Sequence, residues 1–97
     1  MKFRYTETAA REVEQILAYI EQRNRSAAVN VAARLDRTVS AISDFPEIAQ
    51  LTDEPGVRRM PVGRYPYLVF YTVEADELVI LHLRHAAREY PRPQEDR

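Results

Sequence analysis

YLVFYTV (residues 67–73) and LVILHL (residues 78–83) are the two segments that decide the fold of this 97-residue chain. Both are rich in β-branched and aromatic residues, which favour β-strands. The link between them, EADE (residues 74–77), is short and polar. We therefore predict that the two segments are the strands of a β-hairpin.

The register of this hairpin follows if Ala75 and Asp76 form a two-residue loop. Because side chains alternate between the two faces of a sheet, one face then carries three cross-strand pairs and is the more apolar face. The predicted pairs are Thr72 with Val79, Phe70 with Leu81, and Leu68 with Leu83. The opposite face is predicted to carry Tyr67, Val69, Tyr71, Val73, Leu78, Ile80, His82 and Arg84.

The N-terminal half of the chain has apolar residues at helical spacing. Val13, Ile16, Leu17 and Ile20 fall on one face of a helix that we expect over residues 8–23. A second apolar stripe follows after a short polar link, so the two helices should form an antiparallel hairpin. This second stripe comprises Ala28, Val31, Ala32, Leu35, Val39 and Ile42.

The ends of the two helices are marked by polar residues and by a proline. Thr6 and Thr8 are both suited to cap the first helix, and Ser26 is suited to cap the second. The second helix should end at Asp44-Phe45-Pro46, because a residue that precedes proline avoids the helical conformation.

The remaining segments complete a β-α-α-β-β-β order. Short strands are predicted at residues 2–6 and 57–62, with a loop at residues 46–56 and a turn at residues 63–66. This order predicts an α+β fold in which an N-terminal strand and a helical hairpin accompany a mostly antiparallel sheet, with the hairpin packed on one face. We expect one domain over residues 1–91 and a polar tail at residues 92–97.

Composition limits the chemistry that the chain supports. It has no cysteine, which excludes disulfides and cysteine-bound zinc. No apolar stretch reaches the length of a signal peptide core or a membrane span, so we expect a soluble, cytoplasmic protein. The formal net charge is -1, whereas proteins that bind many phosphates usually have a positive net charge. Of the 14 cationic residues, 13 are arginine. We expect no cofactor.

Two motifs add a family resemblance. YPYLVFY (residues 65–71) is followed by HLRHAAR (residues 82–88), and Arg58-Arg59 stands in the strand before the first motif. With the predicted element order, these motifs resemble toxins of the RelE/ParE superfamily and favour its ParE branch. The resemblance covers nearly the whole chain.

The resemblance implies a type II toxin–antitoxin module. The expected partner is a ParD-like antitoxin that forms a hetero-oligomer with the toxin, and DNA would be contacted only indirectly, through that antitoxin. The implied target is DNA gyrase, which ParE proteins inhibit. We predict that Arg84, His85, Arg88 and Tyr90 contact the target. Tyr19, Arg23 and Val29, with an open sheet edge, are predicted to bind the antitoxin.

A RelE-like, ribosome-dependent mRNA endoribonuclease is the alternative. Its chemistry needs a base for the 2′-hydroxyl and cations for the phosphate, and the candidates are Arg59, Arg64, His82 and Arg84. A histidine within an apolar strand, such as His82, is more often a residue that makes a structural hydrogen bond. His82 and His85 should lie on opposite faces of their strand, so we expect no metal site. A third reading is a degenerate, non-toxic member that acts only as an antitoxin partner.

Overall fold

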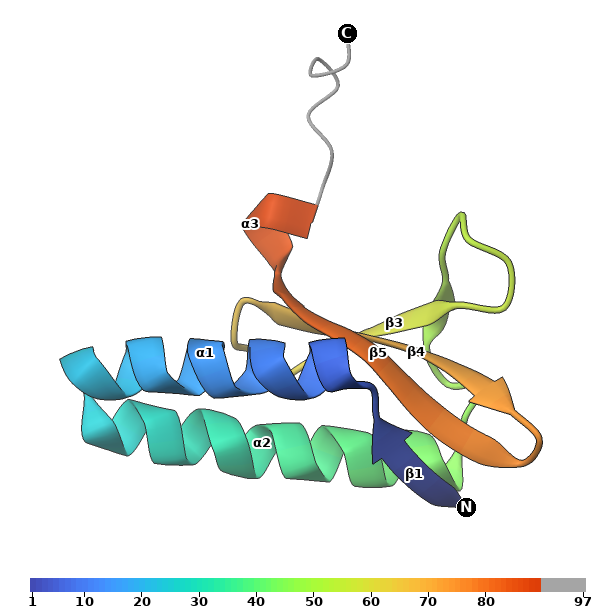
Figure 1. The fold of residues 1–97 in the computed structure, drawn as a ribbon, viewed down its shortest axis with the longest axis horizontal. Coiled ribbons are helices and arrows are strands. Elements are labelled where there is room, and N and C mark those ends of the chain that lie inside the picture. The colour runs from blue at the N-terminus through green and yellow to red at the C-terminus, as the bar shows by residue number, and fades with distance from the viewer. Residues whose placement is uncertain (90–97) are drawn as a thin grey trace, which may run out of the picture.

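The computed structural model describes residues 1–89 and has the predicted α+β architecture. The elements are β1 (Lys2–Tyr5), α1 (Glu7–Arg23), α2 (Arg25–Asp44), β2 (Gln50–Leu51), β3 (Arg58–Pro61), β4 (Tyr67–Glu74), β5 (Glu77–His85) and α3 (Ala86–Glu89). The strands form one sheet in the order β1-β5-β4-β3-β2. β1 pairs with β5 in parallel, whereas the pairings from β5 to β2 are antiparallel. Figure 1 shows α1 and α2 side by side along one face of this sheet.

Two short elements, β2 and α3, were not predicted, and both are too short to leave a sequence period. The N-terminal strand, the helical hairpin and the mostly antiparallel sheet are confirmed. The predicted domain boundary at residue 91 and the tail at residues 92–97 lie outside the described residues and stay predictions.

Side-chain caps fix where the two long helices begin. Thr6, one of the two predicted candidates, accepts a hydrogen bond from the backbone N–H of Ala9 at 3.0 Å. The predicted Ser26 cap is wrong, because Asn24 caps α2 by accepting from the N–H of Ala27 at 3.0 Å. Asn24 has the extended backbone that an N-cap needs, whereas Ser26 already lies inside the helix. The predicted end of α2 at Asp44 is confirmed.

The β4–β5 hairpin turns at Ala75 and Asp76, whose φ angles are 49° and 67°. These values are typical of the type I′ turn that suits a two-residue hairpin loop. The pair Thr72–Val79 next to the turn is confirmed. Beyond Tyr71 the register shifts at a β-bulge.

The bulge makes the two remaining predicted pairs wrong. Phe70 pairs with His82 instead of Leu81, and Leu68 pairs with Arg84 instead of Leu83. Leu81 is the extra residue, and a bulge of this kind reverses the alternation of the residues that follow it. Leu83 therefore joins the helix-facing core, while His82 and Arg84 move to the opposite face from the one predicted.

The helices cover the face of the sheet that carries Tyr67, Val69 and Tyr71. Tyr71 is fully buried, and its hydroxyl donates a 2.8 Å hydrogen bond to the carbonyl oxygen of Pro46. The main core comprises Ala9, Val31, Leu35, Val39, Ile42, Ala49, Val62, Tyr67, Val69, Tyr71, Leu78, Ile80 and Leu83. A smaller cluster of Val57, Leu68 and Phe70, with Leu81 and Ala86 against it, occupies the other face.

Candidate functional site

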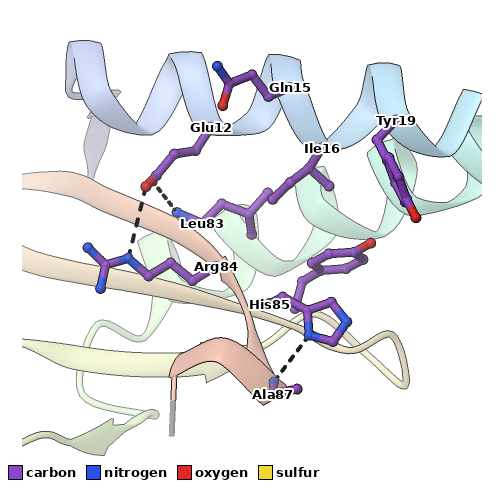
Figure 2. Close-up of a pocket in the computed structure, with 9 residues that line it drawn as sticks. Glu12, Gln15, Ile16, Tyr19, Leu83, Arg84, His85 and Ala87 are labelled. Atoms are coloured by element: carbon purple, nitrogen blue, oxygen red, sulfur yellow. Dashed lines mark hydrogen bonds and ion pairs between the residues drawn. The ribbon is translucent and has the colours of Figure 1, made fainter. Parts of the chain in front are cut away.

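A groove of about 720 Å³ lies between α1 and the C-terminal end of β5. It exists because β1 pairs with β5 only over Glu77–Ile80, so α1 and not a strand lies beside the rest of β5. Its lining residues are Glu12, Gln15, Ile16 and Tyr19 from α1, and Tyr67, Leu83, Arg84, His85 and Ala87 from the sheet and α3. We call this hollow the α1–β5 groove (Figure 2).

Side chains from the start of the helical hairpin satisfy the uncovered backbone of β5. Glu12 accepts a hydrogen bond from the N–H of Leu83 at 3.0 Å. The hydroxyl of Thr6 donates to the carbonyl oxygen of Leu81 at 3.3 Å. Unpaired backbone groups of an edge strand invite pairing with another chain, so these two contacts limit where a partner strand could add to β5.

Glu12 also joins His82 and Arg84 in a charged network at the groove. Its carboxylate lies 3.3 Å from Nδ1 of His82 and 3.9 Å from Nε of Arg84. Nη2 of Arg84 lies 3.2 Å from each ring nitrogen of His82. With the ring hydrogen on Nδ1, the imidazole donates to Glu12 and its Nε2 accepts from Arg84. Both nitrogens of His82 are then engaged within the protein.

The other end of the groove is aromatic. The ring of His85 meets that of Tyr67 edge to face, with centroids 5.4 Å apart, and its Nδ1 accepts from the N–H of Ala87 at 3.1 Å. Tyr19 is 57% exposed, and the guanidinium carbon of Arg23 lies 4.2 Å from the centre of its ring. Exposed aromatic rings beside cations are typical of protein-binding surfaces.

The structure thus places Tyr19, predicted for the antitoxin, in the same groove as Arg84 and His85, predicted for the target (Figure 2). Val29 is 62% exposed on α2 but does not line this groove. The side chain of Arg88 and the whole of Tyr90 lie outside the described part of the chain. The roles assigned to all these residues stay predictions.

Three of the four nuclease candidates share the sheet face opposite the helices. Arg59 and His82 flank Phe70 in register on β3 and β5, and Arg84 stands one row further along. The ring of His82 meets that of Phe70 edge to face, with centroids 6.5 Å apart. Arg64 lies in the β3–β4 turn and lines a different hollow, so it does not join the other three.

Arg58, the neighbour of Arg59, has a structural role. Its Nη1 donates to the carbonyl oxygen of Ala49 at 2.7 Å and so holds the loop before β2 against β3. The pKa values of two tyrosines are raised, but neither residue lines the groove. Burial raises the pKa of Tyr71, and burial together with the nearby Asp36 carboxylate raises that of Tyr5. Neither phenol is therefore activated as a base or a nucleophile.

Within residues 1–89, no group of three or more histidine, cysteine or acidic side chains is arranged to hold a metal ion. No helix in that range combines the length and the apolar character needed to cross a membrane.

Glu12 is a residue of the groove that the sequence analysis did not single out. It lies next to the apolar stripe of α1 and resembles the other glutamates of that helix in the sequence. Only the bulge in β5, which turns the Leu83 N–H toward α1, gives it a role.

The fold and the groove together define a small α+β protein with one open hollow between α1 and β5. A family model described as "ParE toxin of type II toxin-antitoxin system, parDE" matches residues 3–90. The chain therefore belongs to the ParE toxin family and is a ParE-type toxin of a toxin–antitoxin system, which supports an antitoxin as its partner.

Two similar proteins agree with this assignment. "Putative toxin Y4kP" of Sinorhizobium fredii (strain NBRC 101917 / NGR234) is 30% identical over 90 residues, which cover 93% of each chain. A solved structure of the chromosomal ParDE system from P. aeruginosa superposes with a TM-score of 0.71 at 19% identity, covering 88% of this chain and 95% of the other. This second likeness confirms the fold.

Proposed function

We propose that this toxin inhibits DNA gyrase by binding it through the end of β5, and that a cognate antitoxin neutralises it by occupying the α1–β5 groove. The observation that carries the proposal is the convergence of Tyr19, Arg84 and His85 in one open groove. A partner that fills the groove would cover the same cation and imidazole that the target needs. Neutralisation is then direct competition for one surface.

The groove has the chemistry of a docking surface for an amphipathic helix. Ile16 and Tyr19 supply apolar area from α1, and Leu83 and Tyr67 supply it from the sheet. Arg23 beside Tyr19 adds a cation at the rim. Helices that bind in grooves present apolar anchors flanked by polar residues, and a ParD-like antitoxin segment with acidic flanks would fit this pattern.

The groove favours binding over catalysis. A general base must have a free nitrogen or oxygen within reach of the proton that it removes. Both ring nitrogens of His82 contact Glu12 or Arg84, and Arg64 lies apart from the other cations. The net charge of -1 also gives little general attraction to RNA. We expect a cytoplasmic location, where gyrase acts.

Two single variants separate the two halves of the proposal. His85→Ala should weaken inhibition of gyrase supercoiling by at least about tenfold, because an aromatic anchor in a binding surface contributes on the order of 1.4 kcal/mol or more. Tyr19→Ala should keep the inhibition but require more antitoxin to reverse it. Arg11→Ala, on the exposed side of α1, is the matched control. Equal inhibition by wild type and His85→Ala would contradict the assigned target surface.

The ribosome-dependent nuclease remains a second candidate because Arg59, His82 and Arg84 share one sheet face. It predicts new 5′ ends in mRNA on translating ribosomes when the toxin is added. Arg59→Gln should abolish these cuts if the nuclease reading holds. Intact mRNA at toxin concentrations that inhibit gyrase would remove it.

A further inference from the structure

A second hollow of about 710 Å³ lies on the α2 side of the molecule, between that helix and the β3–β4 turn. Asn30, Ala33, Arg34 and Arg37 line it from α2, Met60 and Pro61 line it from the end of β3, and Gly63, Arg64 and Tyr65 line it from the turn. It shares no lining residue with the α1–β5 groove. We call it the arginine hollow.

Three arginine residues line this hollow together, one pair from α2 and the third from the turn. Arg34, Arg37 and Arg64 are exposed, and no aspartate or glutamate is among the lining residues. Within residues 1–89, none of these three guanidinium groups makes a hydrogen bond or an ion pair. In a chain of net charge -1, the hollow is therefore a local concentration of unpaired positive charge.

Local structure holds part of this charge in place. Arg34 and Arg37 are three residues apart, so their Cβ atoms are neighbours on one helix face at about 5–6 Å. Gly63 has a φ of +59°, and a Cβ there would lie 2.5 Å from Nε of Arg34. The arginine side chain thus packs directly over the bare backbone of the turn. A guanidinium that is held in this way loses less entropy when it binds an anion.

We propose that the arginine hollow binds an acidic segment of a protein partner, with at least two carboxylates set against the three guanidinium groups. Arginine binds carboxylates with two parallel hydrogen bonds. The hollow is also lined by Ala33, Met60 and Pro61, which suit the small apolar side chains of a peptide. A nucleic acid is the weaker fit, because it needs phosphate contacts spread along a longer basic surface. The proposal does not depend on the target of the toxin.

The test is fluorescence anisotropy of the full chain with a labelled peptide that alternates glutamate and alanine. The Glu–Ala peptide should bind, and its glutamine counterpart should not. The triple variant R34Q/R37Q/R64Q should weaken binding by roughly tenfold, since each exposed pair contributes a few-fold. Raising NaCl from about 50 to about 500 mM should weaken it as well.

A charge-matched variant separates a site from a general charge effect. K2Q/R11Q/R25Q removes the same charge from residues that line neither hollow, and it should change the affinity by less than about twofold. In NMR spectra, the peptide should shift the amide signals of Ala33, Gly63 and Arg64. These spectra also show that each variant is folded.

Three results would overturn the proposal. Equal losses of peptide affinity in the two triple variants would show that binding depends only on net charge. Absence of peptide binding at about millimolar concentration, the weak end of specific binding, would leave no site. Tighter binding of a single-stranded DNA oligonucleotide of equal charge, lost in R34Q/R37Q/R64Q, would reassign the hollow to nucleic acid.

Discussion

Glu12→Ala is the substitution that tests most sharply how α1 is fixed to β5. The Glu12 carboxylate is the acceptor for the N–H of Leu83 at 3.0 Å and contacts His82 at 3.3 Å. Alanine keeps the helix and removes both contacts. The Leu83 N–H then loses its partner in a partly buried position.

The expected cost follows from these contacts. A hydrogen bond to a charged group contributes about 1.5–3 kcal/mol, and a buried donor left unpaired costs about 1–3 kcal/mol. Arg84 adds little, because its Nε is 3.9 Å away and its side chain is 42% exposed. We therefore expect Glu12→Ala to lower the free energy of unfolding by about 2 kcal/mol. For a domain of this size that loss lowers Tm by roughly 8–16 °C.

Urea denaturation followed by circular dichroism measures this change directly. Glu12→Gln should cost only about 1 kcal/mol or less, because its amide oxygen still accepts from Leu83. Glu14→Ala, on the exposed face of the same helix, controls for helix propensity and should be near neutral. If Glu12→Ala proved no worse than Glu14→Ala, the contact between Glu12 and β5 would have no stabilising role.

Three further predictions concern the core and the hairpin. Tyr71→Phe should cost about 1 kcal/mol at neutral pH in a urea titration, because it removes the 2.8 Å hydrogen bond to Pro46; an unchanged midpoint would contradict this. The pKa of Tyr5 is raised above its ordinary value of 10.0, so its neutral form stabilises the fold below about pH 10, and that contribution is lost as pH rises through the folded pKa. Tyr5→Phe should therefore flatten the fall in Tm between about pH 9 and 11. An equally steep fall in the variant would refute the assignment. Replacing Ala75-Asp76 with Asn-Gly should raise stability by about 1 kcal/mol, since both positions have positive φ; a lower Tm would show that the turn is not type I′.

Local sequence signals predicted the elements well. The amphipathic stripes located α1 and α2, and the strand pair with its polar link located the β4–β5 hairpin and its turn. These features depend on residues close together in the chain. The predicted Ser26 cap was wrong by two residues, because Asn24 and Ser26 are both good capping residues. Only the backbone conformation, which is extended at Asn24, distinguishes them.

The bulge at Leu81 explains most of what the sequence could not predict about the site. Neither glycine nor proline marks it, and LVILHL reads as an uninterrupted strand. One inserted residue moves Leu83 into the core and turns His82 and Arg84 to the other face. The contact of Glu12 with β5 follows from this shift. The lining of the groove therefore could not be predicted by assuming that β5 is a regular strand.

The position of Arg64 was likewise not predictable, because it depends on contacts between residues far apart in the sequence. In the sequence it stands close to Arg59, and the sequence analysis groups it with the nuclease candidates on β3 and β5. In the structure the turn carries it toward α2, where Arg34 and Arg37 face the same hollow. Which helix meets a given turn depends on packing across the whole sheet and not on local pattern.

A DNA-cleavage assay with purified toxin, supercoiled plasmid, ATP and gyrase from a matched bacterium shows directly whether this toxin acts on gyrase. If the toxin inhibits gyrase through the end of β5, linear DNA will appear after treatment with detergent and protease. The linear DNA should be absent when antitoxin is added first and strongly reduced with His85→Ala. Plasmid that stays uncut at every toxin concentration would contradict this proposal. The end of β5 would then have to serve a different target.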